Sequence, residues 1–322
     1  MKIKDLCVSF PSGGGMYPAV EGVSLCVKQG EIFGIVGESG CGKSLTALSI
    51  LRLISDSGKI TGGEIILDGE DILTLSEKEM QRKIRSKKVS MIFQEPMTSL
   101  NPLLTVGEQI AEVLRTHKGM QKQEAKQEAI RYLKMSGIPE PEKRAKAYPH
   151  QLSGGMRQRV MIAIALCCQP KLLIADEPTT ALDVTMQAQI LGLMKQLQEE
   201  TGTSIVMITH DLGVVAEMCH RLAVMYCGNI VEEGSVEDVL HHPSHPYTVG
   251  LLGAIPRMEK SEKFLYNIPG TVPQRDALPK GCRFADRCPH CKEICREKIP
   301  EITDLGGGHS VRCFLFERRS EA

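Results

Sequence analysis

One eight-residue run limits what this chain can fold into more than any other part of its sequence. Residues 37–44 read Gly-Glu-Ser-Gly-Cys-Gly-Lys-Ser and fit the pattern G-x-x-x-x-G-K-[S/T]. The apolar run 31–37 before it predicts a strand, and residues 45–54 after it have helical periodicity. A glycine loop between a strand and a helix turns backbone N–H groups and the positive end of the helix dipole toward one anion. The sequence therefore predicts a nucleoside triphosphate site.

The residue types in this loop, called the P-loop from here on, assign roles within that site. We expect Lys43 to reach the β- and γ-phosphates, and the Ser44 hydroxyl to bind Mg²⁺. The residues expected to contact the nucleotide here are Gly37, Ser39, Gly40, Cys41, Gly42, Lys43, Ser44 and Leu45.

A second motif supplies the carboxylates that triphosphate chemistry requires. The apolar run 172–175 predicts a buried strand, and Asp176 and Glu177 follow it directly. We expect Asp176 to hold Mg²⁺, largely through water, and Glu177 to orient and polarise the attacking water. His210 follows the next predicted strand, 204–209, and is placed to donate to the γ-phosphate.

Strands and helices alternate along the first part of the chain, which indicates a mainly parallel sheet covered on both faces. Residues 106–147 are instead polar and helical, and they predict a helical subdomain over about 95–160. After about residue 235 the pattern loosens and prolines recur. We therefore expect an α/β domain over 1–235 and a small, loop-rich part over 236–322.

Charge and hydropathy narrow the function class. The 39 Lys and Arg residues balance 39 Asp and Glu, and neither expected part has the basic surplus that binding nucleic acid requires. No apolar run approaches the ~20 residues that cross a bilayer, and the first residues lack the apolar core of a secretory signal. We expect a cytosolic protein without nucleic-acid partners, in which disulfides are rare.

The twelve cysteines then divide into two groups. Seven are scattered and are expected to be small buried side chains. Five lie within 282–313, and such a cluster predicts a metal site for which spacing does not choose between zinc and an iron–sulfur cluster. His241, His242 and His245 also suggest a metal site, but the prolines around them favour turn chemistry.

Residues 1–235 resemble the ATPases of ATP-binding-cassette (ABC) transporters. Gln94 resembles their Q-loop glutamine, and Asp176 and Glu177 occupy the expected carboxylate positions. The other segments that carry the resemblance are the signature Leu152-Ser-Gly-Gly-Met-Arg-Gln-Arg159, the D-loop Ala181-Leu-Asp183 and the switch segment Ile208-Thr-His210-Asp. The resemblance implies a P-loop (RecA-like) ABC nucleotide-binding domain with a helical subdomain and ATP hydrolysis at Lys43, Glu177 and His210.

The same resemblance implies how two subunits share a nucleotide. Ser153 and Gly155 of the signature would cap the ATP bound at the P-loop of a second ABC ATPase subunit, identical or different, with Gln94 on Mg²⁺ and Asp183 near the nucleotide. An aromatic residue upstream of the P-loop stacks on adenine in this family. Both Phe10 and Tyr17 are candidates here, and we favour Tyr17.

The cargo is suggested by two further segments. Residues 94–108 and 242–256 resemble the Q-loop region and C-terminal extension of peptide and nickel importer ATPases. This implies a peripheral subunit on the cytoplasmic face of the membrane, docked through its helical subdomain on two permease subunits that an extracytoplasmic binding protein serves. We expect dipeptide or oligopeptide import, with nickel or a metal chelate as the alternative.

The cysteine cluster favours peptide. Its spacing resembles the four-cysteine pattern of dipeptide importer ATPases, which implies a [4Fe–4S] cluster, with zinc as the alternative. The ligands expected from this resemblance are Cys282, Cys288, Cys295 and Cys313, with Cys291 as a spare thiol. An ABC ATPase acting on DNA or RNA would instead require a basic groove, and the charge balance argues against one.

Overall fold

The computed structural model describes residues 1–12, 15–180, 182–255, 267–273 and 278–317. Contacts group the chain into two compact units: unit 1 is Met1–Cys26, Phe33–Asp71 and Thr209–Ala322, and unit 2 is Val27–Ile32 and Ile72–Ile208. Within the described ranges, no helix combines the length and the apolarity that crossing a bilayer requires. The division at residue 235 made from the sequence stays a prediction.

The N-terminal part of unit 1 is an antiparallel sheet. Its strands are β1 (Lys2–Ser12), β2 (Gly15–Cys26), β4 (Lys59–Leu67) and β5 (Glu70–Asp71), in the spatial order β2-β1-β4-β5. The β1–β2 hairpin is not among the strands that the sequence predicts. Register shifts interrupt β1, so its buried Ile3, Leu6 and Val8 do not keep the strict alternation that marks a strand.

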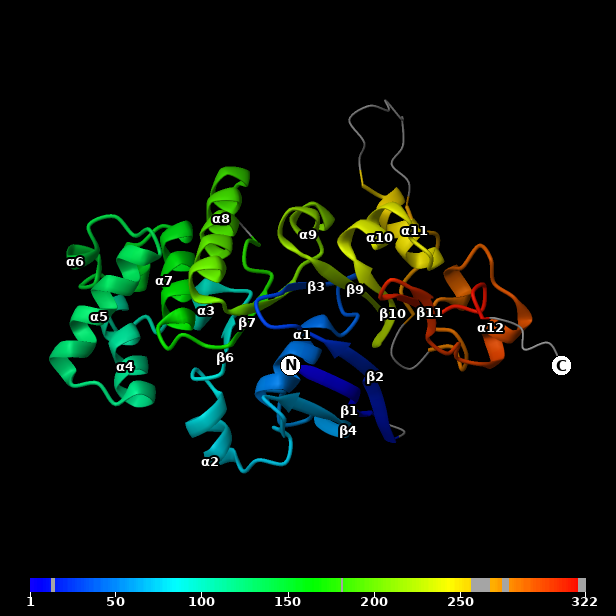
Figure 1. The fold of residues 1–322 in the computed structure, drawn as a ribbon, viewed down its shortest axis with the longest axis horizontal. Helices are drawn as coiled ribbons and strands as arrows, with labels where there is room; N and C mark the ends of the chain where they lie inside the picture. The colour runs from blue at the N-terminus through cyan, green and yellow to red at the C-terminus, as the bar shows by residue number, and fades with distance from the viewer. Residues whose placement is uncertain (13–14, 181, 256–266, 274–277, 318–322) are drawn as a thin grey trace. The chain divides into compact units, whose positions relative to one another are not determined.

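A second group of paired strands in unit 1 leads into the P-loop. It contains β3 (Ile32–Val36), β9 (Arg221–Tyr226), β10 (Asn229–Ser235), β12 (His309–Val311) and β11 (Thr303–Gly306). β3 and β9 run parallel, whereas β10, β12 and β11 add on in antiparallel pairs. The strand order is β11-β12-β10-β9-β3, so in Figure 1 the C-terminal strand β11 (red) lies beyond β12 on the β10 (yellow) side of the sheet. The C-terminal segment thus extends the sheet that carries the P-loop.

The helices of unit 1 and one aromatic cluster complete its core. The helices are α1 (Lys43–Leu51), α9 (Leu212–Met218), α10 (Val236–His241), α11 (Pro246–Gly253) and α12 (Glu293–Glu297), with a 3₁₀ turn at Ala285–Arg287. Tyr226 of β9, Tyr247 of α11 and Phe284 are all buried in one hydrophobic cluster that includes Val36 of β3. The C-terminal segment therefore shares its core with the strand that precedes the P-loop.

Unit 2 combines a parallel sheet with a helical part. β6 (Val89–Ile92), β7 (Leu172–Asp176) and β8 (Ser204–Ile208) pair in parallel, as the alternating pattern predicts. The longer helices are α4 (Val106–Lys118), α5 (Lys122–Met135), α7 (Gly154–Leu166) and α8 (Val184–Thr201). The shorter helices are α2 (Glu77–Glu79), α3 (Pro96–Ser99) and α6 (Pro141–Arg144), with a π-turn at Met80–Ile84 and a 3₁₀ turn at Pro149–Gln151.

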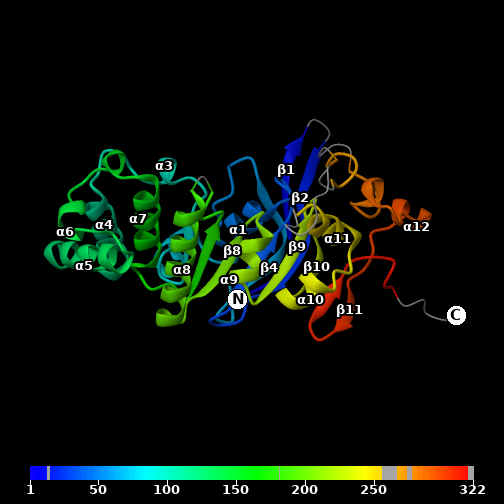
Figure 2. The same ribbon diagram turned by 90° about the horizontal axis from the view of Figure 1, so that it is seen from above.

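Unit 2 has a group of helices that overlaps the range 95–160, where the sequence predicts a helical subdomain, and the bounds of that subdomain stay a prediction. α4, α5 and α7 contact one another, and α6 packs on α5 (Figures 1 and 2). Thr105 and Ser153 cap α4 and α7 through their side-chain oxygens, which explains why these helices begin where they do. The mixed α/β class predicted from the sequence is confirmed.

Candidate functional site

The P-loop joins the buried strand β3 to α1 in the order the sequence predicts. Gly37 has a φ of 150°, and a Cβ there would lie 2.1 Å from the Met225 carbonyl oxygen, so only glycine fits. Gly42, the N-cap of α1, has a φ of 106°. The Lys43 ammonium is buried and donates to the carbonyl oxygens of Gly37 at 2.8 Å and Glu38 at 3.0 Å. The backbone of the P-loop therefore binds the ammonium group of Lys43.

His210 follows a residue of unit 1 that is hydrogen-bonded to β3, the strand before the P-loop. The Thr209 N–H donates to the Ile35 carbonyl oxygen at 3.3 Å, which holds the chain at residue 209 against β3 just before the P-loop begins. The Asp211 N–H donates to the Thr209 hydroxyl at 3.0 Å, and Asp211 in turn caps α9. His210 is exposed between these two fixed neighbours, as a group that contacts a ligand must be.

In unit 2 the structure brings Gln94 and Glu177 together. Gln94 donates through Nε2 to the Glu177 carboxylate at 3.1 Å, and the Thr180 hydroxyl donates to the same oxygen at 2.9 Å. Glu177 itself has a left-handed backbone with a φ of 46°, which is strained for a residue other than glycine. Asp176 ends β7 and is 5% exposed. The two carboxylates are thus adjacent but differ in burial.

The signature and D-loop segments also meet within unit 2. The Ser153 hydroxyl accepts from the Met156 N–H at 3.3 Å and caps α7, while Asp183 caps α8 by accepting from the Met186 N–H at 2.9 Å. A Cβ on Gly155 would lie 2.0 Å from the Met186 methyl carbon, so the first turns of the two helices touch. Ala181, which opens the expected D-loop, lies outside the described residues.

The aromatic candidates Phe10 and Tyr17 are cross-strand partners in the β1–β2 hairpin. Their surroundings differ. A Cβ on Gly58 would lie 2.7 Å from the Phe10 ring, so this ring packs on the Gly58 backbone. The Phe10 ring therefore has a packing role against Gly58.

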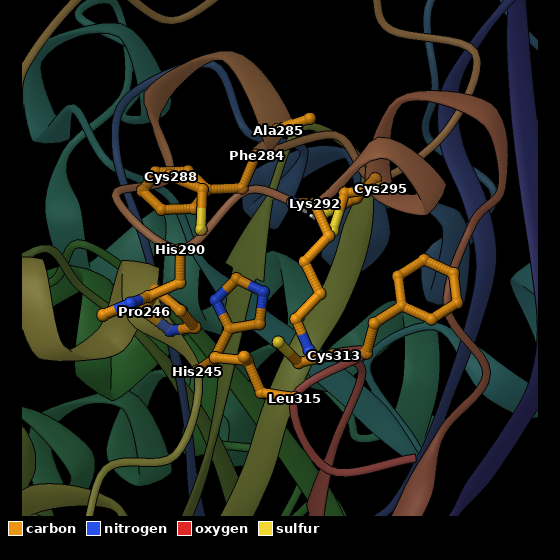
Figure 3. A pocket seen from close by; sticks show the side chains of 12 residues that line it. His245, Pro246, Phe284, Ala285, Cys288, His290, Lys292, Cys295, Cys313 and Leu315 are labelled. Carbon is orange, nitrogen blue, oxygen red and sulfur yellow. Dashed lines mark hydrogen bonds between the residues drawn. The ribbon is translucent and has the colours of Figure 1, made fainter. Parts of the chain in front are cut away.

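Four of the five clustered cysteines line one pocket in unit 1. Cys282, Cys288, Cys295 and Cys313 contribute to its wall together with His245 and Phe284, whereas Cys291 does not. Figure 3 shows Cys288, Cys295 and Cys313 around the same space, with the imidazole of His245 reaching into it. The Cys291 thiol instead donates to the Lys292 carbonyl oxygen at 3.5 Å. The pocket contains the set of four expected from the sequence.

The protein environment of this pocket disfavours charged thiolates. Burial raises the pKa of Cys282 to about 12 and also raises the pKa values of Cys288 and Cys313. Among the described residues, no three Cys, His, Asp or Glu side chains are arranged to hold a metal ion. The four thiols thus line one pocket without being arranged as a metal-binding group.

Of the three histidines noted in the sequence, His245 has the clearest role. It caps α11, with Nδ1 accepting from the Tyr247 N–H at 3.0 Å, as turn chemistry predicts. Burial lowers its pKa to about 3, so the ring is neutral and Nε2 carries the proton. Its backbone N–H donates to the buried Glu232 carboxylate, which His309 also contacts at 2.8 Å.

Sequence reasoning missed two residues that contact the P-loop from the C-terminal segment. Arg287 pairs with the Glu38 carboxylate, and the Tyr247 hydroxyl accepts from the Glu38 N–H at 2.9 Å. No local pattern marks either contact, because the partners lie 249 and 209 residues apart. The only hint in the sequence is that Arg287 directly precedes Cys288.

Two protein families match this sequence. The family described as "ABC transporter" matches residues 20–180, which include the P-loop, Gln94, the signature and both carboxylates. The family described as "Oligopeptide/dipeptide transporter, C-terminal region" matches residues 231–295.

Curated relatives match along nearly the whole chain. The dipeptide transport ATP-binding protein DppD of Bacillus subtilis (strain 168) is 51% identical over 322 residues, covering 100% of this chain and 96% of the relative. The oligopeptide transport ATP-binding protein AppD of the same organism is 56% identical, covering 93% and 92%. The oligopeptide transport ATP-binding protein OppD of Salmonella typhimurium is 51% identical, covering 98% and 93%.

Solved structures match the larger part of the chain. The dimeric ATP-binding cassette MJ0796 in a post-hydrolysis state with ADP and Pi has a TM-score of 0.65 and 34% identity, covering 73% of this chain and 98% of that one. The CbiO1 protein of Clostridium perfringens, part of the transporter complex CbiONQ, has a TM-score of 0.64 and 29% identity, covering 75% and 90%.

Proposed function

Since the chain belongs to the ATP-binding subunits of the dipeptide and oligopeptide ABC transporters, we propose that it hydrolyses ATP to power peptide import through a membrane permease. The relatives quoted above are named for dipeptides and oligopeptides, which favours peptide over the nickel alternative. The division at residue 235 then separates the ATPase part from the extension that marks this family.

The P-loop residues bind the triphosphate of ATP in this proposal. Backbone N–H groups of residues 37–45 surround the phosphates, and Lys43 exchanges its carbonyl partners for the β- and γ-phosphates. Ser44, Gln94 and Asp176 would hold Mg²⁺, which would neutralise charge on the phosphate oxygens. His210 donates to the γ-phosphate from its position after Thr209.

Glu177 acts as the residue that orients the attacking water, and its surroundings are the observation that carries the ATPase proposal. Hydrogen bonds from Gln94 and Thr180 fix the direction of its carboxylate at the end of β7. A carboxylate held in place accepts the proton of a water molecule as that water attacks phosphorus. Its strained backbone is consistent with a position kept for function.

The subunit works as part of an assembly. A second ABC ATPase subunit, identical or different, caps the bound ATP with Ser153 and Gly155 of its signature, and Asp183 lies near that nucleotide. The helical subdomain over about 95–160 docks on two permease subunits at the cytoplasmic face of the membrane. An extracytoplasmic binding protein delivers the peptide to those permeases.

Replacing Glu177 tests the ATPase half of this proposal. Glu177→Gln removes the proton acceptor but preserves the size of the side chain, so kcat for ATP should fall about 10²–10⁴-fold while ATP still binds. Steady-state hydrolysis and equilibrium binding of Mg-ATP measure the two effects. Glu199→Gln, on the exposed face of α8, is the matched control. Unchanged hydrolysis in Glu177→Gln would show that this assignment is wrong.

We also propose that Cys282, Cys288, Cys295 and Cys313 bind a [4Fe–4S] cluster. The observation that supports this proposal is that all four thiols line one pocket, since a cluster of this type takes one thiolate per iron. The bound iron would supply the positive charge that stabilises four thiolates in this buried place. The imidazole of His245 borders the same pocket as a neutral neighbour.

Metal analysis of two cysteine variants tests the cluster. The anaerobically purified protein should contain about four iron atoms per chain and a visible absorption band. Cys288→Ser should lose most of the iron, whereas Cys291→Ser should keep it because this thiol lies outside the pocket wall. Zinc without a visible band, or equal iron in both variants, would overturn the assignment.

A further inference from the structure

We propose that Arg287 and Tyr247 of the C-terminal segment are positioning residues for ATP binding, because together they hold Glu38 of the P-loop. The inference rests on the ATP site proposed above and adds to it a contribution from the family-specific extension. All three residues lie in unit 1.

The ion pair between Arg287 and Glu38 has the geometry of a specific contact. Arg287 Nη1 lies 2.8 Å from one carboxylate oxygen and Nη2 lies 3.1 Å from the other. The Arg287 side chain is 5% exposed and that of Glu38 is 28% exposed. Two parallel hydrogen bonds from one guanidinium fix the orientation of a carboxylate, which a single exposed ion pair does not.

Arg287 is itself held in place by its surroundings. Its Nε donates to the Pro269 carbonyl oxygen at 3.1 Å, and its guanidinium carbon lies 5.8 Å from the ring centre of Tyr226 and 6.0 Å from that of Phe284. A side chain fixed at both its stem and its head loses little freedom on binding Glu38. The ion pair therefore fixes the position of Glu38 in the P-loop relative to the C-terminal segment.

Tyr247 fixes the backbone of the same P-loop residue. Its hydroxyl accepts from the Glu38 N–H at 2.9 Å, and its ring packs against those of Tyr226 at 4.6 Å and Phe284 at 5.4 Å between ring centres. The Glu38 carbonyl oxygen in turn accepts from Lys43 at 3.0 Å. The residue that contacts the phosphate-binding lysine is thus held by its N–H and its carboxylate from outside the P-loop.

The conformation of the P-loop before ATP arrives should depend on these contacts. If the free P-loop adopts several conformations, only a fraction of the molecules can bind ATP, and the apparent Kd for ATP rises in inverse proportion to that fraction. The chemical step is unchanged once ATP is bound. Loss of Arg287 or Tyr247 contacts should accordingly raise Kd and KM for ATP and leave kcat nearly constant. A contact that only stabilises the fold would lower the melting temperature and leave Kd unchanged.

Variants of the full-length protein test this inference. Arg287→Gln should raise Kd and KM for Mg-ATP by about 5–30-fold with kcat within about twofold, and Arg287→Lys should fall between, because lysine keeps the charge without the paired hydrogen bonds. Tyr247→Phe removes only the hydroxyl and should raise Kd by about 2–5-fold. Arg296→Gln is the control, since Arg296 pairs with exposed Asp286 in the same segment.

The double variant Glu38→Gln with Arg287→Gln makes the test specific to the pair. Its Kd for ATP should be no higher than the higher of the two Kd values measured for the single variants, because each single change already removes the interaction. Additive losses, or a lower melting temperature with unchanged Kd in Arg287→Gln and Tyr247→Phe, would overturn the inference. Failure of the unmodified protein and the Arg296→Gln control to bind ATP would instead reject the proposed nucleotide site itself.

Discussion

At the scale of single residues, Tyr17 and Phe10 compete for the same role. They face each other in the β1–β2 hairpin, but the Phe10 ring packs on Gly58. We therefore predict that Tyr17→Ala weakens adenine binding and raises KM for ATP about tenfold, since stacking of a base on an aromatic ring contributes about 1–3 kcal/mol. Tyr17→Trp should restore the unmodified KM, and steady-state hydrolysis measures both.

Phe10→Ala is the comparison for this prediction. It should lower the melting temperature by removing a packed ring, while KM for ATP changes less than twofold. If instead Phe10→Ala raises KM and Tyr17→Ala does not, the stacking residue is Phe10 and the assignment is reversed.

At the scale of secondary-structure elements, Gly155 can be separated into a packing role and a nucleotide role. A Cβ there would meet the Met186 methyl group at 2.0 Å, but this methyl is the end of a flexible side chain. We predict that Gly155→Ala lowers the melting temperature by no more than about 3 °C, and that the assembled transporter loses over tenfold of its ATPase rate. Calorimetry and hydrolysis assays measure the two.

Met186→Ala makes the two roles distinguishable. Combined with Gly155→Ala, it should restore the melting temperature by relieving the contact with α8, but it should not restore ATPase activity. Recovery of activity together with stability would mean that Gly155 serves only helix packing.

The sequence predicts elements well where their signals are local. The strand–loop–helix order around the P-loop and the parallel strands that precede Asp176 and His210 depend on patterns within about 20 residues. The β1–β2 hairpin was missed because bulges break its alternation. The strands β10, β11 and β12 were not predicted either, since they are short or are defined by the pairing of residue 232 with residue 311.

The residues of the candidate site can likewise be predicted only where their sequence signals are local. Lys43, Glu177 and Ser153 stand in motifs that single sequences reveal. The contacts of Glu38 with Arg287 and Tyr247 form only when the C-terminal segment folds back on the P-loop. Such pairs carry no local signal, because the sequence alone does not distinguish a glutamate or arginine in a buried ion pair from one on the surface.

At the scale of the whole molecule, the shared-site proposal predicts that two inactive variants can complement each other. Lys43→Ala removes the P-loop function, and Ser153→Arg blocks the signature. In a two-fold symmetric dimer each site combines the P-loop of one subunit with the signature of the other. Either variant alone therefore has two defective sites and should hydrolyse almost no ATP.

Mixing the two variants concentrates both defects in one site of the heterodimer. The other site combines an intact P-loop with an intact signature, because each comes from the subunit in which it was not changed. Random exchange makes half of the dimers mixed, and half of their sites are intact, so hydrolysis should recover to about one quarter of the unmodified rate. A chain with both substitutions, mixed with unmodified chains, is the control: its heterodimer has no intact site, so activity should come from unmodified homodimers alone. Equal rates before and after mixing the single variants would show that two copies of this chain do not share their nucleotide sites.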